Sequence, residues 1–338
     1  MSSMTNDNFL QILGWDNKCE IFWKELGLAD LRPARIIGQE KTLYRAQFSK
    51  DVILPANITG KIWYDQGSTL DLPAVGDWVA CSLGSTHEPA QIQHIFPRKT
   101  TLQRKHPGTV PIMQIIATNV DYMFIATSLN EDFNIRRIER YLGVALEAGT
   151  KPILLLTKSD LSNNQQEILK SLNQEFSGLK IHVLSHEDPD SMEALKPYFE
   201  IGMTSVLVGS SGVGKSTIVN FLSGSDSQKT QKVSHESKGR HTTTSRNLIF
   251  TRWGGLIIDT PGMKEIAQLE DQNTQIDFSD VEEIFLKCKF SDCKHQTEPG
   301  CAITRALKDK SLSEDRWNSY KLKYIQGKQF TKKSRKQK

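Results

Sequence analysis

Two short motifs constrain the fold of this chain through the order in which they occur. Thr157-Lys158-Ser159-Asp160 stands first, and the glycine-rich run Gly209-Ser210-Ser211-Gly212-Val213-Gly214-Lys215-Ser216 follows it. The glycine-rich run has the spacing of a phosphate-binding loop, and the earlier motif is of the type that reads guanine. An ordinary GTPase carries the two in the opposite order. The chain is therefore expected to fold as an α/β sheet with a circularly permuted motif order, since binding loops at one sheet edge tolerate new chain ends elsewhere.

The glycine-rich run lies between an apolar strand-like segment, Thr204 to Val208, and the start of a helical pattern. Backbone amides and the helix N-terminus would surround the β-phosphate, Lys215 would reach the β and γ oxygens, and the Ser216 hydroxyl would ligate Mg²⁺. A glycine-rich turn without a ligand is the alternative, and the strand–helix context disfavours it. The predicted nucleotide-binding residues here are Gly209, Ser210, Ser211, Gly212, Val213, Gly214, Lys215, Ser216 and Thr217.

A second phosphate element is Asp259-Thr260-Pro261-Gly262, which follows the apolar run Leu256 to Ile258. The carboxyl end of a strand is where open α/β sheets bind ligands. Asp259 would hold Mg²⁺ through water, and the Gly262 amide would hydrogen-bond the γ-phosphate. Alone, such a tetrapeptide is more often an ordinary turn. Its place after the phosphate loop favours nucleotide binding.

Base recognition is expected from Thr157, Lys158 and Asp160, which end the apolar run Pro152 to Leu156. The Asp160 carboxylate can accept hydrogen bonds from the ring N–H and the exocyclic amine of guanine, and the Lys158 stem would cover the base. The motif resembles Asn-Lys-x-Asp of GTPases with Thr157 in place of Asn. Ser185 resembles a further guanine-contacting loop. A Lys-Ser-Asp helix cap would explain these residues equally well if they stood alone.

A Cys/His cluster lies near the C-terminus. Three thiolates and one imidazole suit a closed tetrahedral Zn²⁺ site, which leaves no open position for chemistry. Buried free thiols or a disulfide are the alternatives, but most of the cysteines of the chain fall in this stretch. Cys19 and Cys81 are expected to be packed thiols. The predicted zinc ligands are Cys288, Cys293, His295 and Cys301.

The segment Gly239-Arg240-His241-Thr242-Thr243-Thr244, between the phosphate loop and Asp259, completes a specific likeness. Together with the permuted order and the Cys/His cluster, it resembles the RsgA family of ribosome-associated GTPases, from about Arg35 onward. The resemblance implies an N-terminal β-barrel of the OB-fold type, a central α/β P-loop GTPase domain with circularly permuted motif order, and a C-terminal, mostly helical zinc-binding domain. It also implies GTP hydrolysis to GDP, stimulated by the small ribosomal subunit during its late maturation.

The expected division of the chain follows from this likeness and from changes in composition. It comprises an N-terminal extension at 1–34, an OB-fold RNA-binding domain at 35–112, the permuted GTPase domain at 113–268, the zinc-binding domain at 269–326 and a basic tail at 327–338.

Hydrolysis requires a group that orients the attacking water, and Ras-like enzymes place a Gln just after their Asp-x-x-Gly motif. Here that position is Met263, whose thioether cannot orient water. His241 is the candidate in its place, and an exposed loop imidazole is the alternative. Thr243 would ligate Mg²⁺, although Thr242 is an equally placed hydroxyl. The predicted catalytic residues are therefore His241, Thr243 and Lys215, and intrinsic turnover is expected to be slow.

Basic residues suggest RNA contact at two places. Strand-like runs and glycine turns between Arg35 and Lys105 predict a small barrel, with Arg98, Lys99, Arg104 and Lys105 as candidates for an RNA backbone. The C-terminal stretch 321–338 is basic and contains no acid, which suits sequence-independent phosphate binding. A solvated hairpin and a solvated tail are the alternatives.

The composition is that of a soluble multidomain protein, with 338 residues, a net charge of +4 and no apolar run of membrane-spanning length. Sparse cysteines in a metal pattern and no visible secretory signal favour the cytoplasm. The expected partners are the small (30S) ribosomal subunit and its 16S rRNA, with no membrane, and a monomer is expected. Two other functions stay open: an RNA-binding assembly factor for which GTP is only a structural ligand, and a P-loop ATPase or kinase.

Overall fold

The computed structural model describes most of the chain. The described residues are 6–27, 29–40, 43–60, 62, 69–85, 88–105, 113–130, 133–162, 164–185, 188, 190–224, 246–259, 279–290, 293, 295, 298–314, 316–317 and 320–321.

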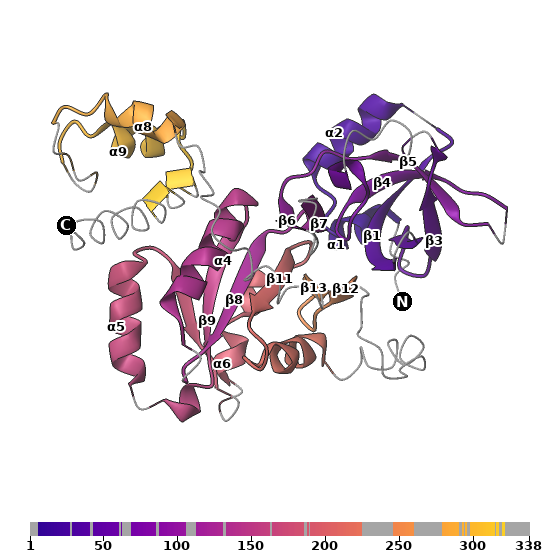
Figure 1. The fold of residues 1–338 in the computed structure, drawn as a ribbon. Helices are drawn as coiled ribbons and strands as arrows, with labels where there is room; N and C mark the ends of the chain where they lie inside the picture. The colour runs from indigo at the N-terminus through magenta and orange to yellow at the C-terminus, as the bar shows by residue number, and fades with distance from the viewer. Residues whose placement is uncertain are drawn as a thin grey trace.

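The chain begins with two helices and a five-stranded barrel (Figure 1). Strand β1 pairs with β2, β2 with β3, β3 with β5 and β5 with β4, and β4 returns to β1. This closure confirms the small barrel expected from the sequence. The elements are α1 (Asn6–Ile12), α2 (Asn17–Leu26), β1 (Arg32–Glu40), β2 (Leu43–Gln47), β3 (Ile53–Ile58), η1 (Thr69–Asp71), β4 (Trp78–Ser82) and β5 (Ala90–Ile95).

The two N-terminal helices pack on the barrel through an aromatic cluster. Trp15 meets Trp78 edge-on at 4.9 Å between ring centroids, and Phe22 lies 4.8 Å from Phe96. The Asp16 side chain caps α2 by accepting from the amide of Cys19. The extension, for which the sequence suggested no role, therefore supplies part of the hydrophobic core at the barrel surface.

A hairpin connects the barrel to the α/β region. Strands β6 (Thr101–Lys105) and β7 (Met113–Thr118) form a separate two-stranded antiparallel sheet. The domain division expected between residues 112 and 113 falls within this hairpin.

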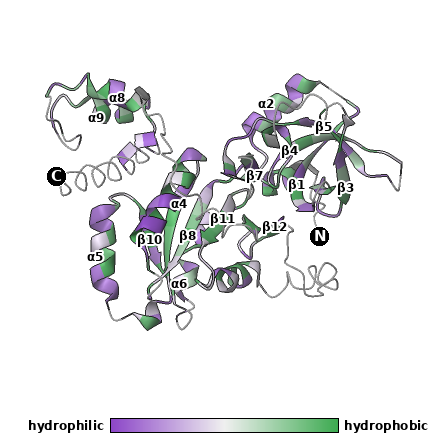
Figure 2. Ribbon diagram, viewed as in Figure 1, coloured by the Kyte–Doolittle hydropathy of each residue, from purple (hydrophilic) through white to green (hydrophobic). Residues whose placement is uncertain are grey.

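The α/β region is built on the strand order β10-β9-β8-β11-β13-β12. Neighbours pair in parallel from β10 to β13, and β12 is antiparallel to β13. Apolar strands lie inside and the helices turn polar faces outward, as the colours of Figure 2 show. The strands are β8 (Tyr122–Ser128), β9 (Lys151–Thr157), β10 (Lys180–Val183), β11 (Thr204–Gly209), β12 (Arg246–Phe250) and β13 (Leu256–Asp259).

Two long helices and one shorter helical segment accompany these strands in the described part of the α/β region. Helices α4 (Ile135–Glu147) and α5 (Gln165–Glu175) match their sequence periodicity, and residues 215–224 are helical after the glycine-rich loop. Residues 190–198 form only a single turn, α6 (Asp190–Glu193), followed by η3 (Lys196–Tyr198). Pro197 lies at the start of η3, where its missing N–H prevents a continuous helix. Strand β8 begins at Tyr122, shortly after Asn119, whose left-handed φ of 53° does not fit an extended strand.

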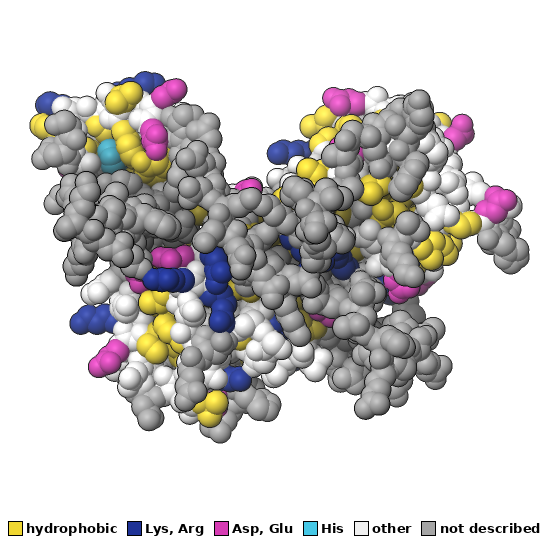
Figure 3. All heavy atoms as spheres, viewed as in Figure 1, with side chains coloured by type: hydrophobic (Ala, Val, Ile, Leu, Met, Phe, Trp, Pro, Cys, Tyr) yellow, Lys and Arg dark blue, Asp and Glu magenta, His cyan; other side chains and the backbone are white. Residues whose placement is uncertain are grey.

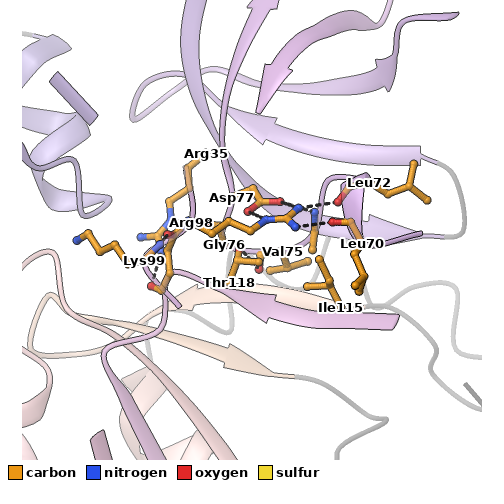
Figure 4. A network of polar contacts seen from close by, with 12 residues as sticks. Arg35, Leu70, Leu72, Val75, Gly76, Asp77, Arg98, Lys99, Ile115 and Thr118 are labelled. Atoms are coloured by element: carbon orange, nitrogen blue, oxygen red, sulfur yellow. Dashed lines mark hydrogen bonds and ion pairs between the residues drawn. The ribbon is translucent and has the colours of Figure 1, made fainter. Parts of the chain in front are cut away.

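A buried arginine joins the N-terminal extension, the barrel and the start of the α/β region. Arg35 is 1% exposed. Its guanidinium donates to the carbonyl of Leu13, to that of Gly76 at 3.2 Å and to that of Asn119 at 3.4 Å. Figure 4 shows this arginine beside the neighbouring network of Asp77. The three segments are thus held by one side chain.

The sequence offered Arg98 as a candidate for RNA contact, but the structure uses its guanidinium inside the protein. Arg98 is committed to the same buried network: its guanidinium makes a two-pronged ion pair with Asp77, at 2.8 and 2.7 Å, and donates to the carbonyls of Leu70 and Leu72 (Figure 4). Lys99 pairs with Asp16 at 2.7 Å. Arg98 is therefore a structural cation, and its partners could not be identified from local sequence because they lie more than 20 residues away.

The C-terminal lobe contains α8 (Ser279–Phe285) and α9 (Ala302–Lys308), packed around Val281, Ile303 and Tyr320. Figure 3 shows hydrophobic side chains gathered on this lobe. Among the residues that the structure describes, no helix is both long and apolar enough to cross a membrane.

Candidate nucleotide site and metal centre

The predicted nucleotide-binding residues come together at one edge of the parallel strands. Gly209 ends β11, Thr157 ends β9, Asp259 ends β13, and Ser185 follows β10. Parallel neighbours place their carboxyl ends on the same side. Four segments that are far apart in sequence therefore form a single edge, as the motif order predicted.

The phosphate loop has the backbone that its glycines permit. Gly209 has a φ of 147°, and a Cβ there would lie 2.4 Å from the carbonyl oxygen of Ala126 on β8. Gly212 and Gly214 have φ values of 79° and 96°, in the region that only glycine adopts freely. This conformation turns successive amides inward, as anion-binding loops require.

Lys215 is the first residue of the helix at residues 215–224, directly after the glycine-rich turn. Its ammonium group donates to the carbonyl of Gly209 at 2.7 Å and to that of Ser210. Ser216 and Thr217 are exposed beside it. The lysine and the two hydroxyls are thus grouped at the helix N-terminus, where anions are favoured.

Thr157 joins the base motif to the phosphate loop. Its hydroxyl donates to the carbonyl of Val213 at 2.6 Å and lies 3.3 Å from that of Thr127. The side chain is 4% exposed. This contact places Thr157 as a support for the loop, because its hydroxyl is used inside the protein. Local sequence carried no signal for the pairing, since Val213 stands far along the chain.

The base motif surrounds an open depression. Lys158 has a left-handed φ of 56°, and the Ser185 hydroxyl donates to Asp160 at 3.1 Å. Ser191, which the sequence did not suggest, accepts from the amide of Ser185 at 3.1 Å. The depression is lined by Ser159, Asp160, Gln165, Val183, Ser185, Asp188 and Ser191.

Several predicted residues lie outside the part of the chain that the structure describes. They include the catalytic candidates His241 and Thr243, the alternative ligand Thr242, and Gly262 with its neighbour Met263. Their roles stay predictions. Residues 225–245 and the basic stretch 322–338 also lie outside it.

The C-terminal cluster brings all four predicted metal ligands together. The ligand atoms of Cys288, Cys293, His295 and Cys301 lie within 4.8 Å of one another. His295 Nδ1 is 3.6 Å from the sulfur of Cys288 and 3.6 Å from that of Cys301. Tetrahedral Zn–S bonds of about 2.3 Å would separate two sulfurs by about 3.8 Å. The group is therefore compact enough to hold a metal ion.

The first turn of α9 supports two of these thiols. The amide of Ala302 donates to Cys288 Sγ at 3.3 Å, and the amide of Thr304 donates to Cys301 Sγ at 3.5 Å. Burial raises the pKa of the Cys301 thiol, but hydrogen bonds from Thr304 and His295 outweigh it and lower that pKa to about 6. The thiolate, which is the form that binds metals, is thereby favoured.

The aromatic neighbours orient the imidazole. The His295 ring stacks on Phe285 at 4.3 Å and meets Trp317 edge-on. By contrast, Cys19 and Cys81 are buried free thiols, and burial raises their pKa values to about 11 and about 12. The expectation that these two are packed thiols is confirmed.

Known proteins with similar sequences identify the family of this chain. The model of the RsgA GTPase family matches residues 95–269. A "Small ribosomal subunit biogenesis GTPase RsgA 2" of Lactiplantibacillus plantarum is 41% identical over 85% of this chain and 80% of its own length. A "Small ribosomal subunit biogenesis GTPase RsgA" of Opitutus terrae is 38% identical over 92% of this chain and 88% of its own. The chain belongs to the RsgA family of GTPases.

Solved structures agree with the RsgA assignment. YloQ, described as a circularly permuted GTPase, superimposes with a TM-score of 0.54 and 26% identity, over 89% of this chain and 96% of its own. YjeQ from Thermotoga maritima has a TM-score of 0.54 and 22% identity over 88% of this chain and 99% of its own, which supports the fold. The permuted GTPase fold, the barrel and the Cys/His group expected from the sequence are confirmed.

Proposed function

We propose that this protein binds the small (30S) ribosomal subunit through its 16S rRNA, acts in late maturation, and hydrolyses GTP to GDP and phosphate to leave. The observation that carries the proposal is the meeting of Thr157, Asp160, Lys215 and Asp259 at one sheet edge, in a chain of the RsgA family. The names of its relatives supply the ribosomal partner.

Each nucleotide-binding group has a separate task in this proposal. The amides of the phosphate loop and the Lys215 ammonium bind the β and γ phosphates, and Asp160 accepts from the guanine ring. Mg²⁺, when bound beside Ser216, Asp259 and Thr243, would neutralise charge that develops on the transferred phosphoryl group. His241 holds the attacking water, which Met263 cannot do. Because Met263 stands where Ras-like enzymes carry the water-orienting glutamine, we expect turnover to depend on the ribosomal subunit.

The C-terminal cluster is proposed to hold one structural Zn²⁺. Its three thiols and one imidazole fill a tetrahedral shell and leave no open position for a substrate. The hydrogen bonds of α9 to Cys288 and Cys301 are of the kind that fixes ligand orientation. We propose that this lobe and the barrel, with the basic tail, contact the ribosomal subunit.

The chain divides, in the same proposal, into an extension at 1–34, an RNA-binding barrel at 35–112, the permuted GTPase domain at 113–268, the zinc-binding domain at 269–326 and a tail at 327–338. A cytoplasmic monomer suits these roles.

Sedimentation with purified small subunits tests the proposal. Protein loaded with a non-hydrolysable GTP analogue should pellet with the subunit, and protein given GTP should return to the supernatant as GDP forms. Ser216→Ala, which removes the Mg²⁺-ligating hydroxyl, should prevent this release. Release by Ser216→Ala at the wild-type rate would favour the rival, an RNA-binding assembly factor for which GTP is only a structural ligand.

A further inference from the structure

Four residues on four neighbouring strands are paired in register, from the barrel to the sheet edge that carries the nucleotide-binding residues. Arg45 of β2 pairs with Gly38 of β1, Gly38 pairs with Asn247 of β12, and Asn247 pairs with Asp259 of β13. Residues directly opposite one another in a sheet project their side chains on the same face. The barrel is therefore joined to the strand that carries Asp259 by an uninterrupted hydrogen-bonded sheet.

Gly38 allows the side chain of Arg45 to lie across β1. The three atoms nearest to a Cβ built on Gly38 all belong to the Arg45 guanidinium, the first at 2.6 Å. Any larger residue at this position would displace the guanidinium. Gly38 has no left-handed φ, so its role is to leave space for a side chain.

The guanidinium that crosses β1 reaches the next strand. Arg45 Nη2 donates to Asn247 Oδ1 at 2.5 Å. An amide whose oxygen accepts from Arg45 keeps its Nδ2 donor for its other neighbours. Asn247 and Asp259 are paired across β12 and β13, and opposite side chains in an antiparallel pair have Cβ atoms about 5 Å apart, which brings the Asp259 carboxylate within reach of the Asn247 amide.

Arg246, the residue before Asn247, holds β12 from the other face. Its guanidinium donates to the carbonyl of Ile115 on β7 at 2.7 Å. The start of β12 is thus fixed by β2 on one side and by the β6–β7 hairpin on the other, and its backbone pairs with β1 and β13.

We propose that Arg45 is a positioning residue of the nucleotide site, which orients Asp259 through Asn247 and so sets the affinity of the site for Mg²⁺. This inference rests on the proposed role of Asp259 in holding Mg²⁺ through water. The barrel, by this account, supplies part of the nucleotide site, and a partner that draws Arg45 away from Asn247 weakens Mg²⁺ binding.

The Mg²⁺ dependence of fluorescent GTP-analogue binding, measured beside that of GTP hydrolysis by the full chain, tests the role of these four residues. Arg45→Ala and Asn247→Ala should each raise the Mg²⁺ concentration for half-maximal binding and half-maximal rate about fivefold, the effect of one lost hydrogen bond of ordinary strength. The double variant should shift it no further than either single variant, because both changes break the same contact. Arg45→Lys, which retains a donor, should recover part of the loss.

Gly38→Ala provides an independent perturbation that leaves both hydrogen-bonding side chains in place. The added methyl displaces the Arg45 guanidinium, so the same shift in Mg²⁺ dependence is expected. Arg32→Ala is the matched control, because Arg32 is an exposed arginine on the same strand β1, and it should behave as the wild type. The thermal midpoints of all these variants should stay within about 2 °C of the wild type.

Two results would overturn the inference in distinguishable ways. If Asp259→Asn raises the Mg²⁺ requirement but Arg45→Ala and Gly38→Ala do not, Arg45 has no positioning role and the proposed function is untouched. If Asp259→Asn leaves the Mg²⁺ requirement unchanged, Asp259 does not serve Mg²⁺ and both the inference and that part of the proposed function fail.

Discussion

The hydroxyl of Thr157 donates a 2.6 Å hydrogen bond to the carbonyl oxygen of Val213, so that a residue of the base motif holds the phosphate loop. This threonine stands where the Asn-Lys-x-Asp motif of GTPases has Asn. Its position at the end of β9 explains the contact, because β9 and β11 both flank β8 and end at the same edge. The two halves of the nucleotide site are therefore coupled through one buried hydroxyl.

Thr157→Val removes this donor at constant shape and leaves the Val213 carbonyl without it. We expect the affinities for GTP and GDP to fall together by about tenfold, the effect of one unsatisfied buried acceptor, with no change in base preference. Fluorescent-nucleotide titration measures this. Thr150→Val is the control, because Thr150 is also buried and donates to the carbonyl of Ala145 at 3.1 Å. A change in base preference at unchanged nucleotide affinity would contradict the role of Thr157 in supporting the phosphate loop.

Asp160→Asn should change which base is bound. The carboxylate accepts from both donors of guanine, whereas an amide can donate to the second carbonyl of xanthine. We expect GTP affinity to fall by more than tenfold and XTP affinity to rise. Competition between the two nucleotides measures the shift, and Asp188→Asn, in the same depression, should leave preference unchanged. A P-loop ATPase would show an ATP preference in the wild type and no shift toward XTP.

Removal of the metal should unfold the C-terminal lobe alone. Structural zinc contributes about 10 kcal/mol or more of apparent folding free energy in small modules, and α8 and α9 share a small core. Cys301→Ser, or a strong chelator, should abolish bound zinc and small-subunit binding while GTP binding persists. Cys81→Ala, in the barrel, should retain one zinc per chain by metal analysis. An intact lobe that still binds the subunit without metal would disprove a structural zinc site.

Arg35→Met should destabilise the N-terminal half. The change removes the donors to the carbonyls of Leu13, Gly76 and Asn119, which would remain buried without them. We expect the free energy of unfolding to fall by about 3 kcal/mol, measured by urea denaturation. Arg32→Met, on the same strand but exposed, should cost less than about 0.5 kcal/mol. Equal effects of the two changes would show that the Arg35 contacts contribute nothing.

Sequence reasoning found the parts of the site that depend on local spacing. The glycine-rich loop and the Cys/His cluster could be predicted because a strand, a turn or a ligand set is specified within a few residues. The contacts Thr157–Val213, Arg45–Asn247 and Arg98–Asp77 could not, because each joins segments that only the sheet order brings together. Arg98 was offered as an RNA contact for the same reason, because the sequence does not show that the Asp77 carboxylate lies beside its guanidinium.

The N-terminal extension gives the same lesson for the fold. Its aromatic residues are visible in the sequence, but their partners Trp78 and Phe96 belong to the barrel. The sequence of a short amphipathic helix does not show which surface its apolar face packs against. The circular permutation of the α/β domain, by contrast, could be predicted from the order of two motifs.

The rate of GTP hydrolysis with and without ribosomal subunits tests the central claim most directly. The purified protein should hydrolyse GTP slowly when alone, and small subunits should raise the rate by at least about tenfold, because completing a GTPase site in trans can contribute far more than that. Large subunits should not raise it, and ATP should not replace GTP. Hydrolysis that small subunits leave unchanged, or that prefers ATP, would contradict the account.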